Sequence, residues 1–180
     1  MKTVWIVDGA YLYSFGKTRP PNGIDYLKLK NELVKVNGGP IFESYYLNST
    51  TEPASDSQNA FHTWIKSAPP KGPKLRVQLY KVKDLHSKCP NCQHQFDRQV
   101  QKGVDVGIAT LIIKLAAQNV YERLILSAGD GDFEDALSYV KSELHKEVWV
   151  HGAQASLSTD LQSYADNVLW LDDMVPAIDK

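Results

Sequence analysis

The feature of this sequence that most constrains its fold is a regular alternation of short apolar runs with longer segments of helical spacing. The short runs are rich in β-branched residues and predict strands, whereas the longer segments repeat apolar residues every three or four positions and predict helices. The expected strands are 2–7, 40–47, 74–82, 122–127, 147–150 and 168–171, and the expected helices are 24–36, 56–68, 103–118, 133–144 and 158–165. The least regular parts are 14–22 and 85–101.

Strands that alternate with helices in this way form a mostly parallel sheet with helices on both faces, joined by right-handed crossovers. We therefore predict an α/β fold, a three-layer α/β/α sandwich with a mostly parallel central sheet. The chain has 180 residues, 43% of them hydrophobic, and a chain of that length can bury about 70% of its unfolded surface. We expect a single domain over 1–180, with a basic loop at about 84–101.

The cellular context is predicted from the apolar runs and the cysteine count. The longest apolar run near the N-terminus, Val4 to Val7, is cut by Asp8, so we expect neither a signal segment nor a membrane-spanning helix. Two cysteines are too few for a disulfide framework and suit a reducing compartment. These observations predict a cytoplasmic protein with no membrane partner.

Charge is distributed unevenly along the chain. Residues 66–102 contain nine basic and two acidic side chains, a net charge of +7, whereas residues 103–180 contain five basic and thirteen acidic side chains, a net charge of −8. A basic stretch followed by an acidic one indicates a polyanionic partner beside a cation-binding site. The alternative is a pair of solvated faces that neutralise each other.

Aspartates occur where the predicted parallel strands end. Asp8 closes the first strand, Asp130 and Asp132 follow the strand 122–127, and Asp105 begins the most apolar helix. Ligands of such sheets bind at the carboxyl edge. Two carboxylates about 4 Å apart at a partly buried site repel each other by about 4 kcal/mol, so a cation is the simplest way to keep them together. Oxygen ligands of this kind predict Mg²⁺ or Mn²⁺.

Each aspartate also has an alternative interpretation as a purely structural residue. Asp8 is compatible with an Asp-Gly turn, Asp132 with the N-cap of the helix 133–144, and Asp105 with an acid in a first helical turn. A nucleotide cofactor is not expected, because the segment 129–131 lacks the third glycine of a dinucleotide loop and its carboxylate would repel pyrophosphate.

The basic stretch contains a nine-residue segment with four side chains that can bind a metal: His86, Cys89, Cys92 and His94. A single Cys-x-x-Cys is half of a zinc site. Both histidines would have to fold back over a tight loop to complete it, or a second subunit would supply ligands, which would make a homodimer. The alternatives are a surface turn with free thiols and a redox pair.

The sequence resembles the NYN family of PIN-like nucleases, and within it the bacterial LabA-like proteins. The similar segments are 4–12, 101–109, 124–133 and 152–171, and the order Lys-Gly-Val-Asp-Val followed by Ser-Ala-Gly-Asp-Gly-Asp-Phe is the most specific part. The resemblance implies a PIN-like fold, an acidic pocket that binds Mg²⁺ or Mn²⁺, and endonucleolytic cleavage of RNA.

Carried onto this chain, the family's acidic positions fall on Asp8, Asp105 and Asp130, with Asp132 as a fourth. Polar neighbours of the pocket would be Ser127 or Ser158, and the latter is also a candidate N-cap. Basic residues along the loop would hold the RNA backbone: Lys81, Lys83, Lys88, Arg98 and Lys102.

Two positions depart from the family pattern. Tyr11, which would lie behind the pocket, replaces the usual Asn, and Leu111 stands where an acid is often found. Losing these polar groups would weaken a second metal. Two hypotheses therefore remain open: a metal-dependent endoribonuclease, or a catalytically weak or inactive module of the same fold that binds RNA or a protein.

Overall fold

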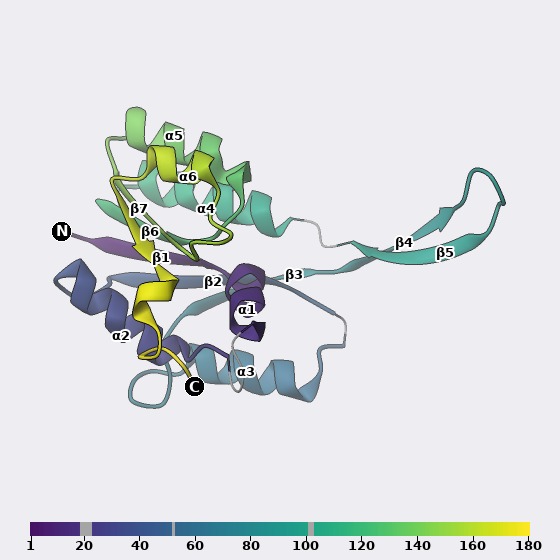
Figure 1. Cartoon of the computed structure of the whole chain (residues 1–180), viewed down its shortest axis with the longest axis horizontal. Helices are drawn as coiled ribbons and strands as arrows, with labels where there is room; N and C mark the ends of the chain where they lie inside the picture. The colour runs from purple at the N-terminus through teal and green to yellow at the C-terminus, as the bar shows by residue number, and fades with distance from the viewer. Residues whose placement is uncertain (19–22, 52, 101–102) are drawn as a thin grey trace.

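A six-stranded parallel sheet forms the centre of the molecule (Figure 1). The computed structural model describes residues 1–18, 23–51, 53–100 and 103–180, and for 83–86 and 96–100 it describes the backbone only. Strands in the order β3-β2-β1-β6-β7-β8 all run in the same direction. The strands are β1 (Thr3–Asp8), β2 (Glu43–Thr50), β3 (Arg76–Lys81), β6 (Arg123–Ser127), β7 (Glu147–Gly152) and β8 (Asn167–Trp170).

Helices cover both faces of the sheet, which confirms the predicted three-layer α/β/α fold (Figure 1). On one face lie α1 (Gly9–Lys17), α2 (Tyr26–Asn37) and α3 (Asp56–Lys66). The other face carries α4 (Val104–Ala117), α5 (Glu134–Ser142) and α6 (Thr159–Tyr164). Two short 3₁₀ helices, η1 (Gly131–Phe133) and η2 (Leu171–Met174), follow β6 and β8.

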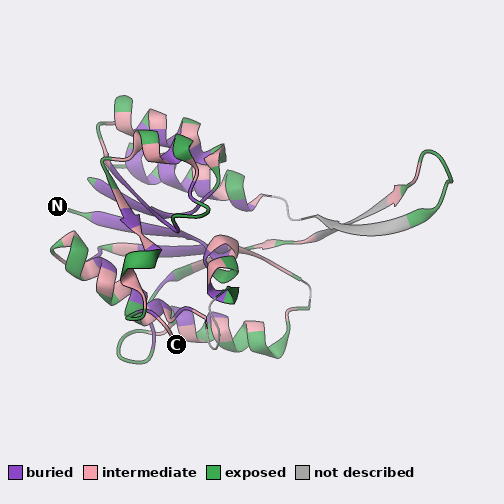
Figure 2. Cartoon of the chain, viewed as in Figure 1, coloured by how far each residue is buried: buried purple, intermediate pink, exposed green. Residues whose placement is uncertain are grey.

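The central strand β1 shows why two hydrophobic layers are needed. Val4 and Ile6 pack with α4, α5 and α6, whereas Trp5 and Val7 pack with α1, α2 and α3. All four side chains are fully buried, because successive residues of a strand point to opposite faces. Figure 2 shows this burial concentrated on the strands. Each such side chain stabilises the fold by about 1.5–3 kcal/mol.

The order of the strands creates a crevice at one edge of the sheet. From β1 the chain builds β2 and β3 on one side, then returns so that β6 pairs with the other side of β1. The helices that follow β1 and β6 therefore leave toward opposite faces. In open parallel sheets, the carboxyl ends of two such strands are where ligands bind.

The helix α1 was not predicted from the sequence. Part of it was expected to be irregular, and Asp8 with Gly9 resembled a turn. Instead Asp8 is the N-cap of α1, and its Oδ1 accepts hydrogen bonds from the backbone N–H groups of Ala10 (3.0 Å) and Tyr11 (3.2 Å). The structural role considered for Asp8 is therefore present, as a helix cap.

The segment 85–101 was also expected to be irregular, and that prediction was wrong for its described part. It forms an antiparallel hairpin of β4 (Lys83–Lys88) and β5 (Gln95–Val100), which we call the arm. The arm extends away from the rest of the molecule (Figure 1). Its strands are mostly polar, so they lack the apolar alternation that identifies a half-buried strand in a sequence.

A buried polar network ties three strands together beneath the carboxyl edge. Trp5 Nε1 donates to Ser127 Oγ (2.8 Å), and Ser127 Oγ lies 2.7 Å from His151 Nδ1. Because the indole N–H can only donate, the serine hydroxyl accepts from it, and the same oxygen makes the hydrogen bond to His151 Nδ1. Burial lowers the pKa of His151 to about 3.

This burial predicts a pH-dependent stability. The unfolded chain protonates His151 near its ordinary pKa of 6.5, whereas the folded chain does so only near 3. The histidine's contribution is thus present above pH 6.5 and is lost as the pH falls toward 3. At pH 5 the loss should be about 2 kcal/mol. Urea unfolding at several pH values should show a shallower pH slope for His151→Gln than for the unmodified chain, and equal slopes would contradict the assignment.

Candidate functional site

Four aspartates from separate parts of the chain meet at the crevice between β1 and β6. Asp8 ends β1, Asp130 and Asp132 lie in the turn after β6, and Asp105 lies in the first turn of α4. Burial raises the pKa of Asp8, and the negative charges of Asp105 and Asp130 raise it further, against two backbone hydrogen bonds that lower it. The four acids that the sequence singled out therefore interact electrostatically, and of the four Asp105 and Asp132 line the pocket described below.

Asp105, in the first turn of α4, also interacts with the other aspartates. Desolvation raises the pKa of Asp105, followed by the negative charges of Asp130 and Asp132. Like charges this close disfavour the ionised form of each other. Among the described residues, no basic side chain lines the pocket that Asp105 and Asp132 share. The local charge therefore favours binding of a cation.

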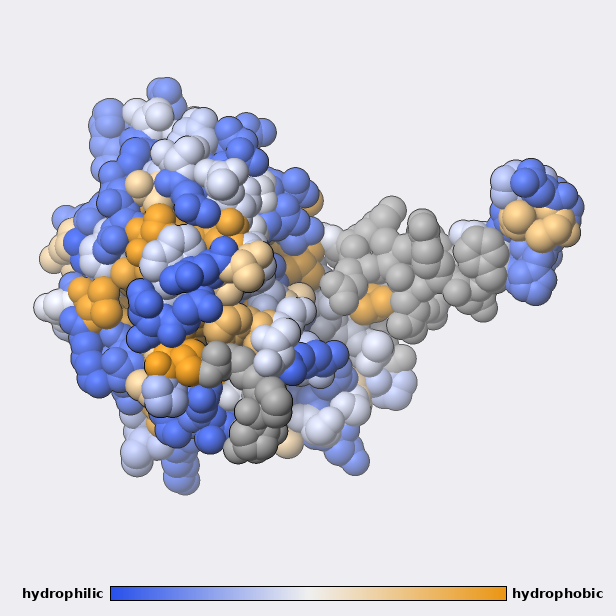
Figure 3. Space-filling view, in the orientation of Figure 1, coloured by the Kyte–Doolittle hydropathy of each residue, from blue (hydrophilic) through white to orange (hydrophobic). Residues whose placement is uncertain are grey.

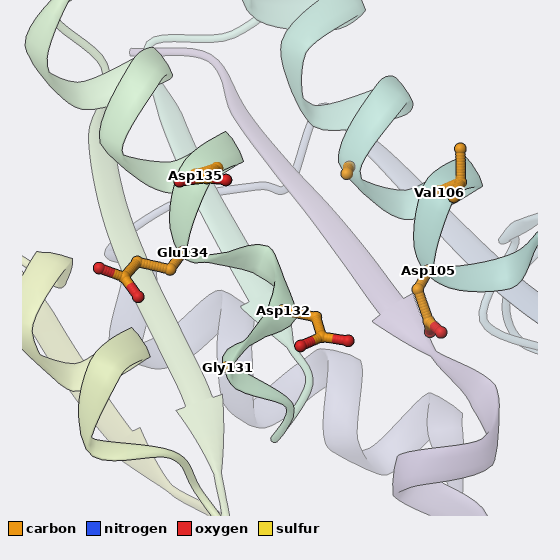
Figure 4. Close-up of a pocket in the computed structure, with 7 residues that line it drawn as sticks. Asp105, Val106, Gly131, Asp132, Glu134 and Asp135 are labelled. Carbon is orange, nitrogen blue, oxygen red and sulfur yellow. The ribbon is translucent and has the colours of Figure 1, made fainter.

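The turn after β6 is held by Asp130. Its Oδ1 accepts the backbone N–H of Asp132 (3.1 Å), which makes Asp130 the N-cap of η1. Asp132 does not cap the following helix. The N-cap residue of α5 is Phe133, which provides no side-chain hydrogen bond. The carboxylate of Asp132 instead faces Asp105 across the pocket (Figure 4).

The pocket between α4 and η1 has a volume of about 480 Å³. Its lining residues are Asp105, Val106, Ala109, Gly131, Asp132, Glu134 and Asp135. Sequence reasoning missed Glu134 and Asp135, because acids in the first turn of a helix are common for purely local reasons. Figure 4 shows Glu134 directed away from the facing pair. The pocket is consequently more acidic than predicted.

The donor set fits a hydrated divalent cation. Within the described side chains, no three His, Cys, Asp or Glu residues are close enough together to hold a metal ion as a group. Mg²⁺ does not need such a cage, since it keeps several waters and uses one or two carboxylates plus substrate phosphates. Asp105 and Asp132 supply carboxylate oxygens of the kind that Mg²⁺ or Mn²⁺ binds, and the described residues that line this pocket include no Cys or His.

Glycines set the position of the helix that carries Asp105. Gly103 has φ 98°, and a Cβ at Gly107 would lie 2.0 Å from the hydroxyl oxygen of Tyr80. The Tyr80 ring, near the end of β3, thus packs directly on the first turn of α4. This contact joins the base of the arm to the acidic pocket.

Three predicted neighbours of the pocket have structural roles. The hydroxyl of Tyr11 accepts the N–H of Ala153 (2.9 Å), and its ring fills the space beside Gly129, where a Cβ would lie 2.2 Å away. Tyr11 therefore supports the turn that carries Asp130. Ser127 belongs to the buried network described above, and Ser158 is the N-cap of α6, accepting from Asp160 N (3.1 Å).

The second departure from the family pattern, Leu111, lies outside the lining of the pocket. Leu111 is 8% exposed and packs in the hydrophobic layer under α4. It is not one of the residues that line the pocket. A side chain at this position contributes to the core in this chain.

The predicted basic and metal-binding residues of the arm are only partly described. Lys81 and Lys88 are exposed, whereas the side chains of Lys83, Arg98 and His86, and all of Lys102, lie outside the described residues. Cys92 and His94 are exposed and Cys89 is half-buried. The described side chains include no third ligand beside the two cysteines.

Comparison with known proteins identifies the family. The model of the NYN domain matches residues 2–172, nearly the whole chain, so this chain belongs to the NYN domain family. The family has a nuclease-like, PIN-like fold. Its match does not separate the LabA-like subgroup from other members, and that assignment stays a prediction. Comparison with curated proteins gives no significant match.

Solved structures support the fold. A protein of unknown function from Vibrio parahaemolyticus superposes with a TM-score of 0.71 over 99% of this chain and 96% of its own, at 22% sequence identity. MurG of Acinetobacter baumannii reaches a TM-score of 0.40 over 93% of this chain and 41% of its own, at 12% identity, which is too low to inform on this chain. Among the described helices, none has the length and hydropathy needed to cross a membrane.

The repulsion in the pocket predicts how it responds to metal. At neutral pH the raised pKa of Asp105 reflects a destabilised carboxylate, so Asp105→Asn should raise the melting temperature by about 1–2 °C in EDTA. Added Mn²⁺ should stabilise the unmodified chain more than the variant, because the variant has lost a ligand. Glu143→Gln, at the opposite end of α5, is the matched control and should retain the full Mn²⁺ shift. Equal Mn²⁺ shifts for all three proteins would exclude Asp105 as a ligand.

Proposed function

We propose that this protein is a metal-dependent endoribonuclease of the LabA-like type, which hydrolyses RNA phosphodiesters at the carboxyl edge of the sheet. The observation that carries the proposal is the convergence of Asp8, Asp105, Asp130 and Asp132 at the crevice between β1 and β6, where they interact electrostatically. Membership in the NYN family supports it.

In this proposal Asp8, Asp105 and Asp130 would hold one or two Mg²⁺ or Mn²⁺ ions. A divalent ion in such a site lowers the pKa of a bound water and neutralises charge on the phosphate. Four carboxylates alone would repel a phosphodiester, so substrate binding and cation binding should be coupled.

The chain's own residues would contribute orientation and proton transfer. Asp132 faces Asp105 across the pocket (Figure 4). A carboxylate in that position can accept a proton from the attacking water. Asp130 keeps the turn in shape through its bond to the Asp132 N–H, and Tyr11 supports the same turn from behind.

The basic stretch would bind the RNA backbone. Its described end, at Tyr80 and Lys81, adjoins the first turn of α4 and therefore the pocket. Lysines attract phosphates through a charge interaction that depends on salt and hardly on sequence. An RNA lying along the arm would thus lead into the acidic pocket.

An RNA cleavage assay that compares the unmodified chain with Asp130→Asn and Glu143→Gln tests the proposal. The unmodified chain should cut a labelled single-stranded RNA with Mn²⁺ and fail to cut it with EDTA, as read on a denaturing gel. Asp130→Asn should lose at least about 100-fold in rate, as expected when a group that stabilises the transition state is removed, while Glu143→Gln should cut normally.

The alternatives give different results in the same assay. RNA binding without cleavage by any of the proteins would favour the inactive regulatory module. Equal cleavage by the unmodified chain and Asp130→Asn would indicate a contaminating nuclease and remove support for this site.

Salt dependence tests the role of the arm in binding. Fluorescence anisotropy of a single-stranded RNA, measured in Ca²⁺ from about 50 to 200 mM salt, should give a linear fall of log affinity with log salt. Lys88→Gln should reduce the slope by about 0.7, the value for one phosphate contact on a single strand. Lys114→Gln, at the far end of α4, should leave the slope unchanged. An unchanged slope for Lys88→Gln would place the RNA elsewhere.

A further inference from the structure

The tip of the arm is a tightly closed turn that presents two cysteines. The backbone N–H of Cys89 donates to the carbonyl of His94, and the N–H of Gln93 donates to the carbonyl of Cys89, both at 2.9 Å. Gln93 takes up a left-handed conformation with φ 58°. Non-glycine residues rarely adopt this conformation, and here it closes the turn around the two thiols.

The two sulfur atoms are arranged as a pair of ligands. The Cys89 sulfur accepts hydrogen bonds from the backbone N–H groups of Cys92 and Asn91 and also makes a hydrogen bond with the Cys92 side chain. Zinc ligands must be deprotonated thiols, and hydrogen bonds of this kind stabilise a thiolate. The hydrogen bond between the two side chains shows that the sulfurs lie close together, as do sulfurs that bind one zinc ion, each at about 2.3 Å from the metal.

The arm has little support from the rest of the fold. In the described part of the chain β4 and β5 pair only with each other, and Figure 1 shows them standing clear of the sheet and helices. An isolated two-stranded hairpin is marginally stable in water. The end of the arm is mostly hydrophilic, with a small hydrophobic spot (Figure 3). A cross-link at the tip would supply the stability that packing does not.

We propose that Cys89 and Cys92 of two copies of this chain together bind one Zn²⁺, which joins the two molecules tip to tip. A structural zinc takes four ligands in a tetrahedron, and each tip supplies two. The described side chains bring no third histidine, cysteine or acid to the cysteines, so the described part of one tip supplies half of a zinc site. A two-fold axis through the metal would make the two halves equivalent.

The geometry and charge of the arm suit this arrangement. Each strand of six residues spans about 20 Å, which keeps the two bodies apart while the tips meet. Binding releases one proton from each of the four thiols, and the resulting tetrathiolate zinc carries a charge of −2. The exposed Lys88 next to Cys89 on each chain offsets that charge. The proposal is independent of the nuclease activity.

Zinc content and molecular mass, measured on the same full-length sample in reductant, test the bridge. We expect one zinc per two chains and a mass by light scattering of about twice the 20.2 kDa of the single chain. Cys89→Ser and Cys92→Ser should each be monomeric and lose the zinc. His94→Ala should keep both the zinc and the dimer, and so should Asp130→Asn, whose change lies in the turn after β6. Circular dichroism should show that all four variants are folded.

Three outcomes would overturn the proposal. A monomer with one zinc per chain, lost in His94→Ala, would mean that the chain completes the site with its own histidines. A dimer that persists in EDTA and in Cys89→Ser would be formed by another surface. A reduced chain that binds no added Zn²⁺, tested in parallel with Co²⁺ to detect thiolate absorption bands, would exclude a metal at the tip.

Discussion

Repulsion between carboxylates at one edge of the sheet is the constraint on which the site depends. The acids are brought together because β1 and β6 are neighbours, and the hydrophobic layers on both faces of these strands hold them in place. Burial raises the pKa of Asp8 and of Asp105, and the negative charges of the neighbouring aspartates raise both further. A site of this kind is therefore built by the core and completed by what binds to it.

The sequence predicted the sheet and most helices well because their signals are local. A strand such as 122–127 is apolar throughout and is followed by turn residues, and the same logic located Asp8 and Asp130 at strand ends. The first helix was missed because Asp-Gly is a common turn signal. In this structure Asp8 is the N-cap of α1 and Gly9 is its first residue. The arm was missed because its polar strands pair with each other and bury no apolar face.

The finer parts of the site depend on contacts that no local pattern records. Tyr11 was expected as a neighbour of the metal, yet its hydroxyl lies on the backbone of Ala153, 142 residues away. Ser127 was expected near the pocket, but it is held in the core between Trp5 and His151. These roles follow from the packing of separate strands, so they become visible only once the sheet is assembled.

The two strands of the arm have edges that could pair with strands of other molecules. Both long edges of the β4–β5 ribbon lack a partner strand in the described part of the chain, and such edges invite pairing with strands of other molecules. The ribbon sequence includes Lys83, Lys88 and Arg98 together with Asp84 and Asp97. Charged residues on exposed edges disfavour sheet extension and aggregation. A ribbon sequence with this many charges is therefore expected to resist pairing with strands of other molecules.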